Sequence, residues 1–301
     1  MNNNTNENLS LKDFMLTLWD KKLFIFIVSL SFAIFSVFFA LSIPNKYASS
    51  ALLIPNQSDV SNAGMLNQLS GMASLAGITL PTESNDRSTE AIEKIKSFEF
   101  FDKHFLSNIS LENLMAVRDW EYDTNTIIYD ENIFNSSKGE WIREVSYPKK
   151  TIPSAQEAFK TYNTILNISQ DTKTSFVYLT VKHHSPFIAQ KWAEIIISEI
   201  NNSMRISDKD KALKSIEFLN NQLPRVNYEE IRVSIAKLQE EQMKSLMLIE
   251  SNDDYVFQTL DSPIVPEIKS SPNRALICFL ITLFGFIFSL LIIVIRHHRE
   301  H

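Results

Sequence analysis

Each end of the chain carries an uncharged apolar run that is long enough to cross a lipid bilayer. Residues 23–43 and 275–295 each form a stretch of 21 residues without a charged side chain. A helix of about 20 apolar residues spans roughly 30 Å of hydrocarbon. We therefore expect two transmembrane helices, at 23–43 and 275–295. The first run exceeds the roughly 7–15 apolar residues of a signal peptide, so we expect an uncleaved anchor there.

Basic side chains flank both runs on the side of the chain ends. They are Lys12, Lys21, Lys22, Arg296 and Arg299. Short basic flanks stay on the cytoplasmic side of a membrane. We expect cytoplasmic tails at 1–22 and 296–301, both too short to fold as a kinase, an ATPase or a signalling domain. Residues 44–274 then lie outside the membrane, which is the periplasm in a Gram-negative cell.

Small residues recur on one face of each predicted transmembrane helix. They are Ser29, Ala33, Ser36 and Ala40 in the first helix, and Gly285 and Ser289 in the second. Small side chains let helix backbones approach closely in lipid. We expect the two helices to pack through these residues, within one chain or between chains. The alternative is that small residues occur there by chance.

The region between the two apolar runs mixes strand and helix patterns. We expect strands at 46–54, 163–170, 174–182 and 255–260, and helices at 88–105 and after the capping box Ser154–Glu157. The polar residues 119–153 predict an irregular insert. Residues 58–80, rich in small side chains, predict either a semi-ordered loop or a segment that packs on the membrane or on a neighbouring subunit.

A long helical hairpin is expected within this region. Ser185 and Pro186 suit the cap and the first residue of a helix, and no further Pro or Gly follows until Pro224. The charged stretch 205–211 predicts a solvated middle. A second helix is expected to begin at the cap Asn227, so the hairpin covers about residues 186–250. The predicted fold is an α+β periplasmic domain with this long projecting hairpin, anchored by two transmembrane helices.

Composition and motifs argue against an enzyme. The net charge of −6 disfavours nucleic-acid binding, the single cysteine excludes an internal disulfide, and five glycines form no nucleotide-binding loop. His183 and His184 are neighbours in a strand and point to opposite faces, so they do not share a metal. Three tryptophans could stack on sugars but are more often buried: Trp120, Trp141 and Trp192. We expect no catalytic residue, metal or cofactor.

A proline-rich segment carries a resemblance to a known family. Residues 255–274 read YVFQTLDSPIVPEIKSSPNR and lead directly into the second apolar run with its central Gly285. This segment resembles the one before the second transmembrane helix of the Wzz polysaccharide chain-length determinants, also called polysaccharide co-polymerases. The sequences AIEKIKSFEFFDKHF at 91–105 and SIAKLQEEQMKSLMLIESNDDYVF at 234–257 are also similar to that family.

The resemblance implies an inner-membrane protein that forms a ring-shaped homo-oligomer, with the hairpins around a central axis above an α/β base. It implies a regulator of the chain length of O-antigen or a related surface polysaccharide that acts with the membrane polymerase; contact with the nascent polysaccharide is left open. The short C-terminal tail differs from relatives that carry a fused cytoplasmic kinase. On this basis we expect Pro263, Pro266, Pro272 and Gly285 to couple the outer domain to the membrane partner.

Two other functions remain open from the sequence. One is a co-polymerase or adaptor for capsule or exopolysaccharide export, because those proteins share this topology. The other is a periplasmic ligand sensor, which would have to recruit a separate partner for its output.

Overall fold

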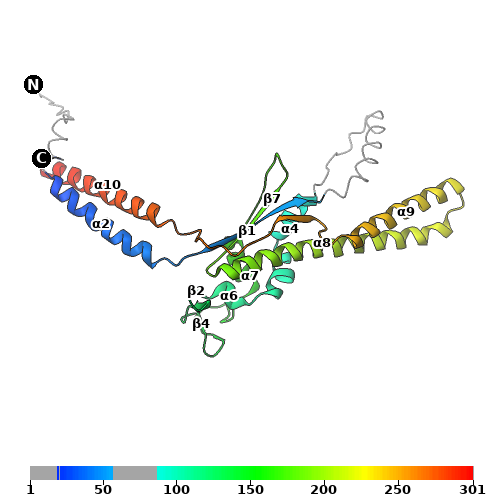
Figure 1. Ribbon diagram of the computed structural model, residues 1–301, viewed down its shortest axis with the longest axis horizontal. Coiled ribbons are helices and arrows are strands. Elements are labelled where there is room, and N and C mark those ends of the chain that lie inside the picture. The colour runs from blue at the N-terminus through cyan, green and yellow to red at the C-terminus, as the bar shows by residue number, and fades with distance from the viewer. Residues whose placement is uncertain (1–18, 20, 57–86, 301) are drawn as a thin grey trace, which may run out of the picture. The chain divides into compact units, whose positions relative to one another are not determined.

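The computed structural model describes residues 19, 21–56 and 87–300, and it divides into two compact units (Figure 1). The outer unit comprises Lys46–Ile268, and the terminal unit combines Met1–Asn45 with Lys269–His301. The expected segment at 58–80 lies outside the described residues. The two units are described separately below.

The terminal unit contains helices α2 (Lys22–Ser42) and α10 (Arg274–Glu300), which pack against each other. Both are long and apolar enough to cross a membrane, over Lys22–Ser42 and Arg274–Ile295, and most of their large apolar side chains are exposed. The apolar runs therefore form helices as expected, within one residue of the expected starts. Helix α10 continues past the expected end, to Glu300.

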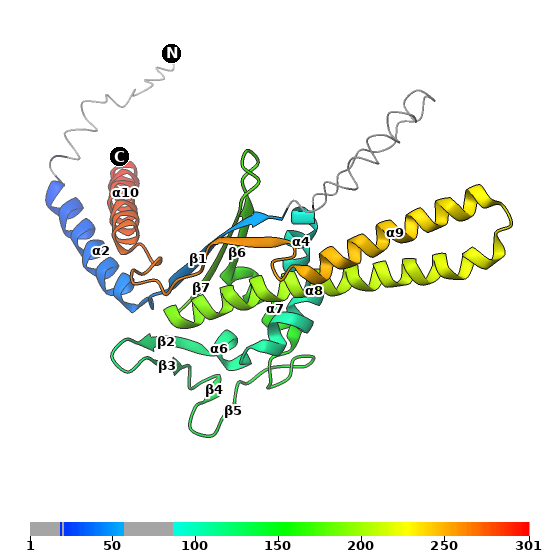
Figure 2. The ribbon, with the colours of Figure 1, turned by 45° about the vertical axis from the view of Figure 1, so that its right-hand side comes forward.

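An antiparallel four-stranded sheet in the order β6-β7-β1-β8 organises the outer unit (Figure 2). Its strands are β1 (Tyr47–Pro55), β6 (Leu166–Gln170), β7 (Val177–His183) and β8 (Phe257–Asp261). All four expected strands are present. The second begins three residues later than expected, because helix α7 (Ala155–Ile165) extends up to it.

The core lies between one face of this sheet and the helices. Val177, Leu179 and Val181 alternate along β7 and are fully buried, as the period of two in the sequence predicts. Helix α8 (Pro186–Gln222) covers them with Trp192 and other apolar side chains of its first half. Rings from the helical segment at 98–105 complete the core around Tyr162.

The prediction of a single helix at 88–105 is wrong, because the helix is interrupted at Ser97. Ser97 has an extended backbone (φ −77°, ψ 150°), and its hydroxyl accepts a hydrogen bond from the amide of Phe100. A serine that caps a new helix stops the previous one. The segments are α4 (Arg87–Ile95), α5 (Phe98–Phe100), a π-helix (Phe101–Phe105), a 3₁₀ turn (Leu106–Asn108) and α6 (Leu111–Met115).

The polar insert expected at 119–153 is more regular than predicted, since it contains two short hairpins. The first pairs β2 (Val117–Glu121) with β3 (Thr126–Tyr129), and the second pairs β4 (Phe134–Asn135) with β5 (Glu140–Trp141).

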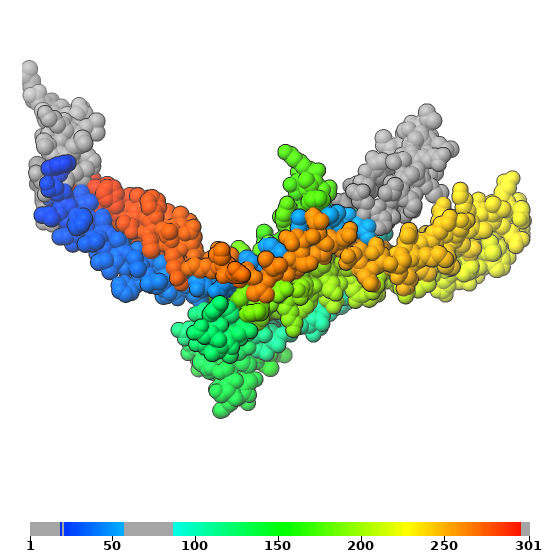
Figure 3. Space-filling model, viewed as in Figure 1, coloured from blue at the N-terminus to red at the C-terminus, as the bar shows by residue number. Residues whose placement is uncertain are grey.

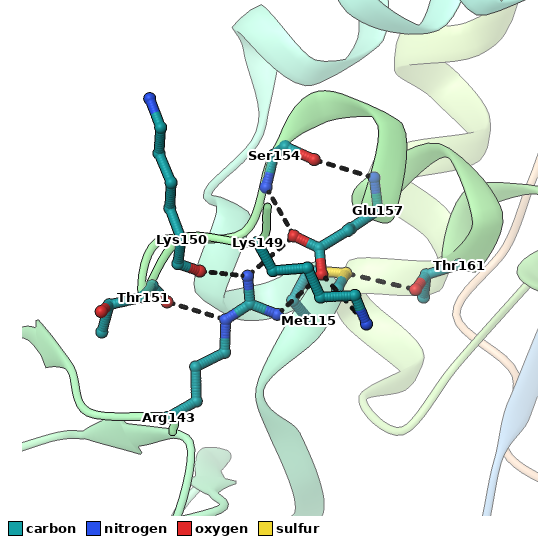
Figure 4. Close-up of polar contacts among 8 residues, drawn as sticks. All are labelled: Met115, Arg143, Lys149, Lys150, Thr151, Ser154, Glu157 and Thr161. Atoms are coloured by element: carbon teal, nitrogen blue, oxygen red, sulfur yellow. Dashed lines mark hydrogen bonds and ion pairs between the residues drawn. The ribbon is translucent and has the colours of Figure 1, made fainter. Parts of the chain in front are cut away.

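An ion pair fixes the end of this insert to the start of α7 (Figure 4). The capping box is confirmed: Glu157 N–H donates to Ser154 Oγ, and Glu157 Oε2 accepts from Ser154 N–H. Arg143 donates to both carboxylate oxygens of Glu157, at 3.1 and 2.8 Å, and to the carbonyls of Lys150 and Thr151. One guanidinium therefore joins two parts of the insert to each other and to the helix.

The expected helical hairpin is present, and its yellow end projects from the rest of the outer unit (Figure 3). It consists of α8, a 3₁₀ turn (Leu223–Arg225) and α9 (Glu229–Ser251). Two details differ from the expectation. Tyr228 rather than Asn227 precedes the first turn of α9, without a side-chain cap. The middle of α8 is not wholly solvated, because the Asp208 side chain is only 12% exposed.

The Arg143–Glu157 pair predicts an acid sensitivity. Hydrogen bonds from Arg143, and then from the Ser154 backbone, lower the pKa of Glu157 from 4.5 to about 2. A depressed carboxyl pKa stabilises the fold above its ordinary value, and this contribution disappears as the pH falls towards the folded value. Glu157→Gln should therefore lower the urea midpoint of the detergent-solubilised protein at neutral pH, and the difference from wild type should shrink between pH 4.5 and about 2.

Glu144→Gln, at an exposed position of the same insert, is the matched control. A Glu157→Gln deficit that stays constant across this pH range would contradict the role of the ionised carboxylate.

Candidate functional site

The chain that follows β8 is fixed to the sheet and to α8. Pro263 is buried, and its carbonyl accepts a hydrogen bond from Gln190 Nε2 at 3.2 Å. The carbonyl of Ile264 accepts one from Ser49 Oγ at 2.7 Å. Ser49 belongs to β1, so the start of the proline-rich segment lies along the strand that opens the outer unit. Proline fixes its own backbone φ angle, and these bonds hold the segment in place.

The four residues expected to couple the outer domain to the membrane partner are divided between the two units. Pro263 and Pro266 belong to the outer unit, whereas Pro272 and Gly285 belong to the terminal unit. Pro266 and Pro272 are both half-buried. Pro263 lies against α8, through the hydrogen bond from Gln190 to its carbonyl. The coupling role of the four residues stays a prediction.

Gly285 lies where α10 contacts α2. A Cβ atom built at this position would lie 2.5 Å from both Cβ and Cγ of Phe32. The Phe32 ring packs against the rings of Phe284 and Phe288, with centroids 6.3 and 6.2 Å apart. A side chain at position 285 cannot be accommodated without moving Phe32, so glycine sets how closely the helices approach.

The other small residues of the two helices differ in burial. Ser36, Ala40 and Ser289 are buried, while Ser29 and Ala33 are half-buried. Ser36 Oγ and Ser289 Oγ donate to carbonyls three residues earlier, at 2.7 Å each, so these hydroxyls are satisfied within their own helices. Their role in packing within or between chains stays a prediction.

A disulfide can report on this packing. Cys278 Sγ lies 3.7 Å from the Ser36 carbonyl oxygen, so Ser36→Cys places a second thiol next to the native cysteine. Gly285→Ala should lower the rate of disulfide cross-linking between positions 36 and 278 several-fold, because the added methyl group displaces Phe32. The rate is measured by gel mobility after mild oxidation. Ala275→Val, at an exposed position of α10, is the control, and equal rates in both variants would contradict the close-approach role of Gly285.

A buried amide holds the last strand to the hairpin. Asn201 of α8 is 4% exposed. Its Oδ1 accepts from the backbone N–H groups of Val256 and Phe257, and its Nδ2 donates to the Phe257 carbonyl, all at 2.9 Å. One side chain therefore satisfies three backbone groups at the start of β8.

A polar cluster lies beside this clamp, where the hairpin leaves the sheet. Arg87 Nη1 donates to Tyr255 Oη at 2.6 Å, and Tyr255 Oη donates to Asp208 Oδ2 at 2.9 Å. Arg87 Nη1 also lies 3.3 Å from Asp208 Oδ2. Burial raises the pKa of Tyr255 to about 12. The phenol therefore stays protonated at neutral pH, and its O–H group donates the hydrogen bond to Asp208. This cluster joins α4, α8 and the chain that enters β8.

Replacing the buried amide tests how the hairpin is held. Asn201→Ala removes the side-chain partner of three buried backbone groups, and we expect a loss of about 1–3 kcal/mol in the free energy of unfolding. Urea unfolding in detergent measures this loss. Its neighbour Asn202 is half-buried and makes a single 3.3 Å contact with Arg205, so Asn202→Ala should cost less. Equal losses in the two variants would refute the clamp.

The outer unit also contains an open polar hollow of about 450 Å³ between α8 and the end of β8. Its lining includes Glu194, Asn202, Arg205, Asp253 and Ser262. Arg205 is paired with Asp253 at 3.2 Å. These groups can hydrogen-bond a polar ligand, but they include no nucleophile paired with a base.

His183 is buried and His184 is half-buried, and their ring centroids lie 6.1 Å apart. His183 is buried, with Nδ1 accepting from the Ser185 amide and Nε2 lying 2.9 Å from the Asn113 carbonyl. Burial lowers the pKa of His183 to about 4, so it is neutral at neutral pH and Nε2–H donates to Asn113. Among the described residues no three His, Cys, Asp or Glu side chains come together to hold a metal.

The three candidate sugar-stacking tryptophans are also separated. Trp192 is buried in the core and cannot reach a ligand. Trp141 is half-buried against Phe134 in the second hairpin of the insert. Trp120 is half-buried in a group of aromatic rings at one end of the outer unit.

A comparison with protein-family models matches residues 7–113 to "Wzz: Chain length determinant protein". The resemblance to the Wzz family is confirmed over these residues, which include the similar stretch at 91–105 and exclude those at 234–257 and 255–274. The matched range contains α2, β1 and the helical segments up to the start of α6, so it covers the first apolar helix and the opening of the outer unit. A comparison with curated protein sequences found no match.

Solved structures with related descriptions are similar to this chain at low identity. A "full-length bacterial polysaccharide co-polymerase" is 13% identical, with a TM-score of 0.41, covering 96% of this chain and 98% of its own. A fragment of WzzB, a polysaccharide co-polymerase from Salmonella Typhimurium, is 14% identical with a TM-score of 0.27, covering 75% of this chain and all of its own.

Sequence reasoning missed the groups that hold the proline-rich segment and β8. Ser49, Gln190 and Asn201 make these bonds, and none belongs to a recognisable motif. Of the three, only Asn201 could have been noticed in the sequence. It is a polar amide four residues after Ile197, on the apolar face of α8, where a buried side chain is expected.

Proposed function

We propose that the protein is an oligomeric inner-membrane scaffold that regulates the chain length of O-antigen or a related surface polysaccharide. The match of residues 7–113 to the chain length determinant family is the observation that carries this proposal. In this role the protein acts on a membrane polymerase, which extends the glycan, and it performs no catalysis itself.

The proposed membrane placement has two transmembrane helices, 23–43 and 275–295, with tails 1–22 and 296–301 in the cytoplasm and residues 44–274 in the periplasm. The exposed apolar surfaces of α2 and α10 support it, because such surfaces are stable in lipid rather than in water. The basic residues that flank the two apolar runs on the side of the chain ends support the orientation.

The proposed homo-oligomer assembles through the hairpins of neighbouring copies. Large apolar side chains on both hairpin helices are exposed in the single chain, and contiguous exposed apolar surface commonly marks an interaction site. They include Leu213, Phe218, Ile231, Val233, Met247 and Leu248. A ring of copies would cover them while leaving the charged faces of the helices in water.

Coupling to the polymerase is assigned to the proline-rich segment and to Gly285. Pro263 is held on the outer unit, and Pro272 precedes α10 by two residues. A rigid extended segment between them would transmit the position of the outer unit to the second helix. The polymerase partner and any contact with the nascent polysaccharide are part of this proposal.

Complementation of a gene deletion tests the function. Deletion should convert a clustered ladder of surface polysaccharide on a gel into a random, short-weighted one, and the wild-type gene should restore the clusters. Pro266→Ala combined with Pro272→Ala should restore polymer but with a shifted length distribution, because a flexible segment no longer fixes the helix.

Pro148→Ala, at an exposed proline of the insert, is the control and should restore the wild-type profile. A wild-type profile from the double variant at normal abundance would contradict the coupling role. If deletion removes capsule or secreted polymer and leaves the ladder unchanged, the protein serves polysaccharide export instead.

A further inference from the structure

A group of aromatic rings lies at one end of the outer unit. Trp120 and Tyr122 come from the β2–β3 hairpin, Tyr47 opens β1, and Phe187 lies in the first turn of α8. The Trp120 ring centroid is 5.5 Å from that of Tyr47, 5.8 Å from Tyr122 and 6.3 Å from Phe187. Figure 2 shows the hairpin beside the start of α8. Three distant segments therefore meet in one aromatic cluster.

Two rings of this cluster are exposed and two are half-buried, and exposed apolar side chains follow on a segment that is hydrogen-bonded to the same two elements. Tyr122 is 80% exposed, and Phe187 is about half exposed. Gln190, one turn after Phe187, donates a hydrogen bond to the Pro263 carbonyl. Ser49, two residues after Tyr47, donates one to the carbonyl of the next residue, Ile264. The exposed Ile264 and Ile268 follow on this segment. We call the whole surface the aromatic rim: Tyr47, Trp120, Tyr122, Phe187, Ile264 and Ile268.

Both chain connections to the apolar helices begin at this rim. Tyr47 lies five residues after Ser42, the last residue of α2, and Ile268 lies six residues before Arg274, the first of α10. An extended chain covers at most about 3.6 Å per residue, so these connections reach no further than about 18 and 22 Å. Wherever α2 and α10 enter a bilayer, Tyr47 and Ile268 therefore lie within about 18 and 22 Å of the helix ends.

The chemistry of the rim suits the interface rather than the hydrocarbon. Tyrosine and tryptophan combine an apolar ring with a polar group and are enriched at the headgroup level. Glu121 and Asp123 flank Tyr122 in the hairpin, and charged groups avoid the hydrocarbon. Trp120 Nε1 donates to Asn125 Oδ1 at 2.9 Å, so the indole is satisfied without reaching deeper.

We propose that the aromatic rim rests on the phospholipid headgroup region of the bilayer that α2 and α10 cross, and that this contact fixes the orientation of the outer unit at the membrane surface. This inference rests on the membrane placement in the proposed function. Exposed rings also suit stacking on a glycan, but the two short connections favour lipid, because they limit the distance of Tyr47 and Ile268 from the ends of α2 and α10 whether or not a glycan is bound.

Nitroxide labels on the full-length protein test the contact. In a Cys278→Ser background, the protein is placed in nanodiscs of phosphatidylethanolamine and phosphatidylglycerol and labelled at Tyr122→Cys. Tyr228→Cys is the matched control, since Tyr228 is 75% exposed and lies at the other end of α8, which is about 55 Å long. Spin-resonance power saturation gives the accessibility of each label to oxygen and to a water-soluble nickel chelate.

We expect the oxygen-to-nickel ratio to be several-fold higher at position 122 than at position 228. Equal, water-like ratios would overturn the proposal. A label at Leu30→Cys in α2 separates the two hypotheses, because it should report hydrocarbon if the membrane placement is right. If the label at position 30 has a water-like ratio, the proposed membrane placement of α2 is wrong, and this inference, which rests on it, is wrong too. If position 30 reports hydrocarbon and position 122 reports water, only this inference fails.

Purified surface polysaccharide provides the glycan arm of the test. If the label at position 122 has a water-like ratio and becomes immobilised when the polysaccharide is added, the rim is a glycan surface and the lipid proposal is overturned. An unchanged spectrum together with the high oxygen-to-nickel ratio supports lipid.

Discussion

Strand β1 is the first element after α2, and β8 is the last strand before α10; the two lie side by side in one sheet, with Ile54 opposite Gln258 and Pro55 opposite Phe257. This pairing joins segments about two hundred residues apart. Closing so long a loop costs conformational entropy. Asn201 and Ser49 add side-chain bonds to the same returning segment. The hairpin, the core and the exit towards α10 all depend on this closure.

The parts of the fold that could be predicted are those that short sequence patterns specify. The apolar runs, the alternation along β7, the capping box at Ser154 and the Ser185–Pro186 helix start each require only neighbouring residues, and all are present. The break at Ser97 was missed because the apolar residues continue at helical spacing across it. Local periodicity does not reveal that the serine side chain caps a new helix.

The candidate site was harder to predict because it depends on contacts between distant segments. Asp208 lies in a run of charges that is typical of a solvated helix face, but Arg87 and Tyr255 arrive from α4 and from the chain before β8 to enclose it. Arg143 belongs to a polar insert, and only the fold shows that it holds Glu157. For the same reason, the proline-rich segment was recognised from sequence, whereas its anchoring by Gln190 was not.

Helix α8 runs without interruption from the core to the turn of the hairpin. Its first half is packed on the sheet through Trp192 and Ile196, and no proline or glycine lies between Pro186 and the turn. Sharp bends in helices mostly arise at such residues. The part of the helix beyond Met204 is about 27 Å long, so a tilt of about 5° where it leaves the sheet moves its tip by about 2 Å. A small tilt of the packed half of α8 is therefore amplified into a larger displacement of the hairpin turn.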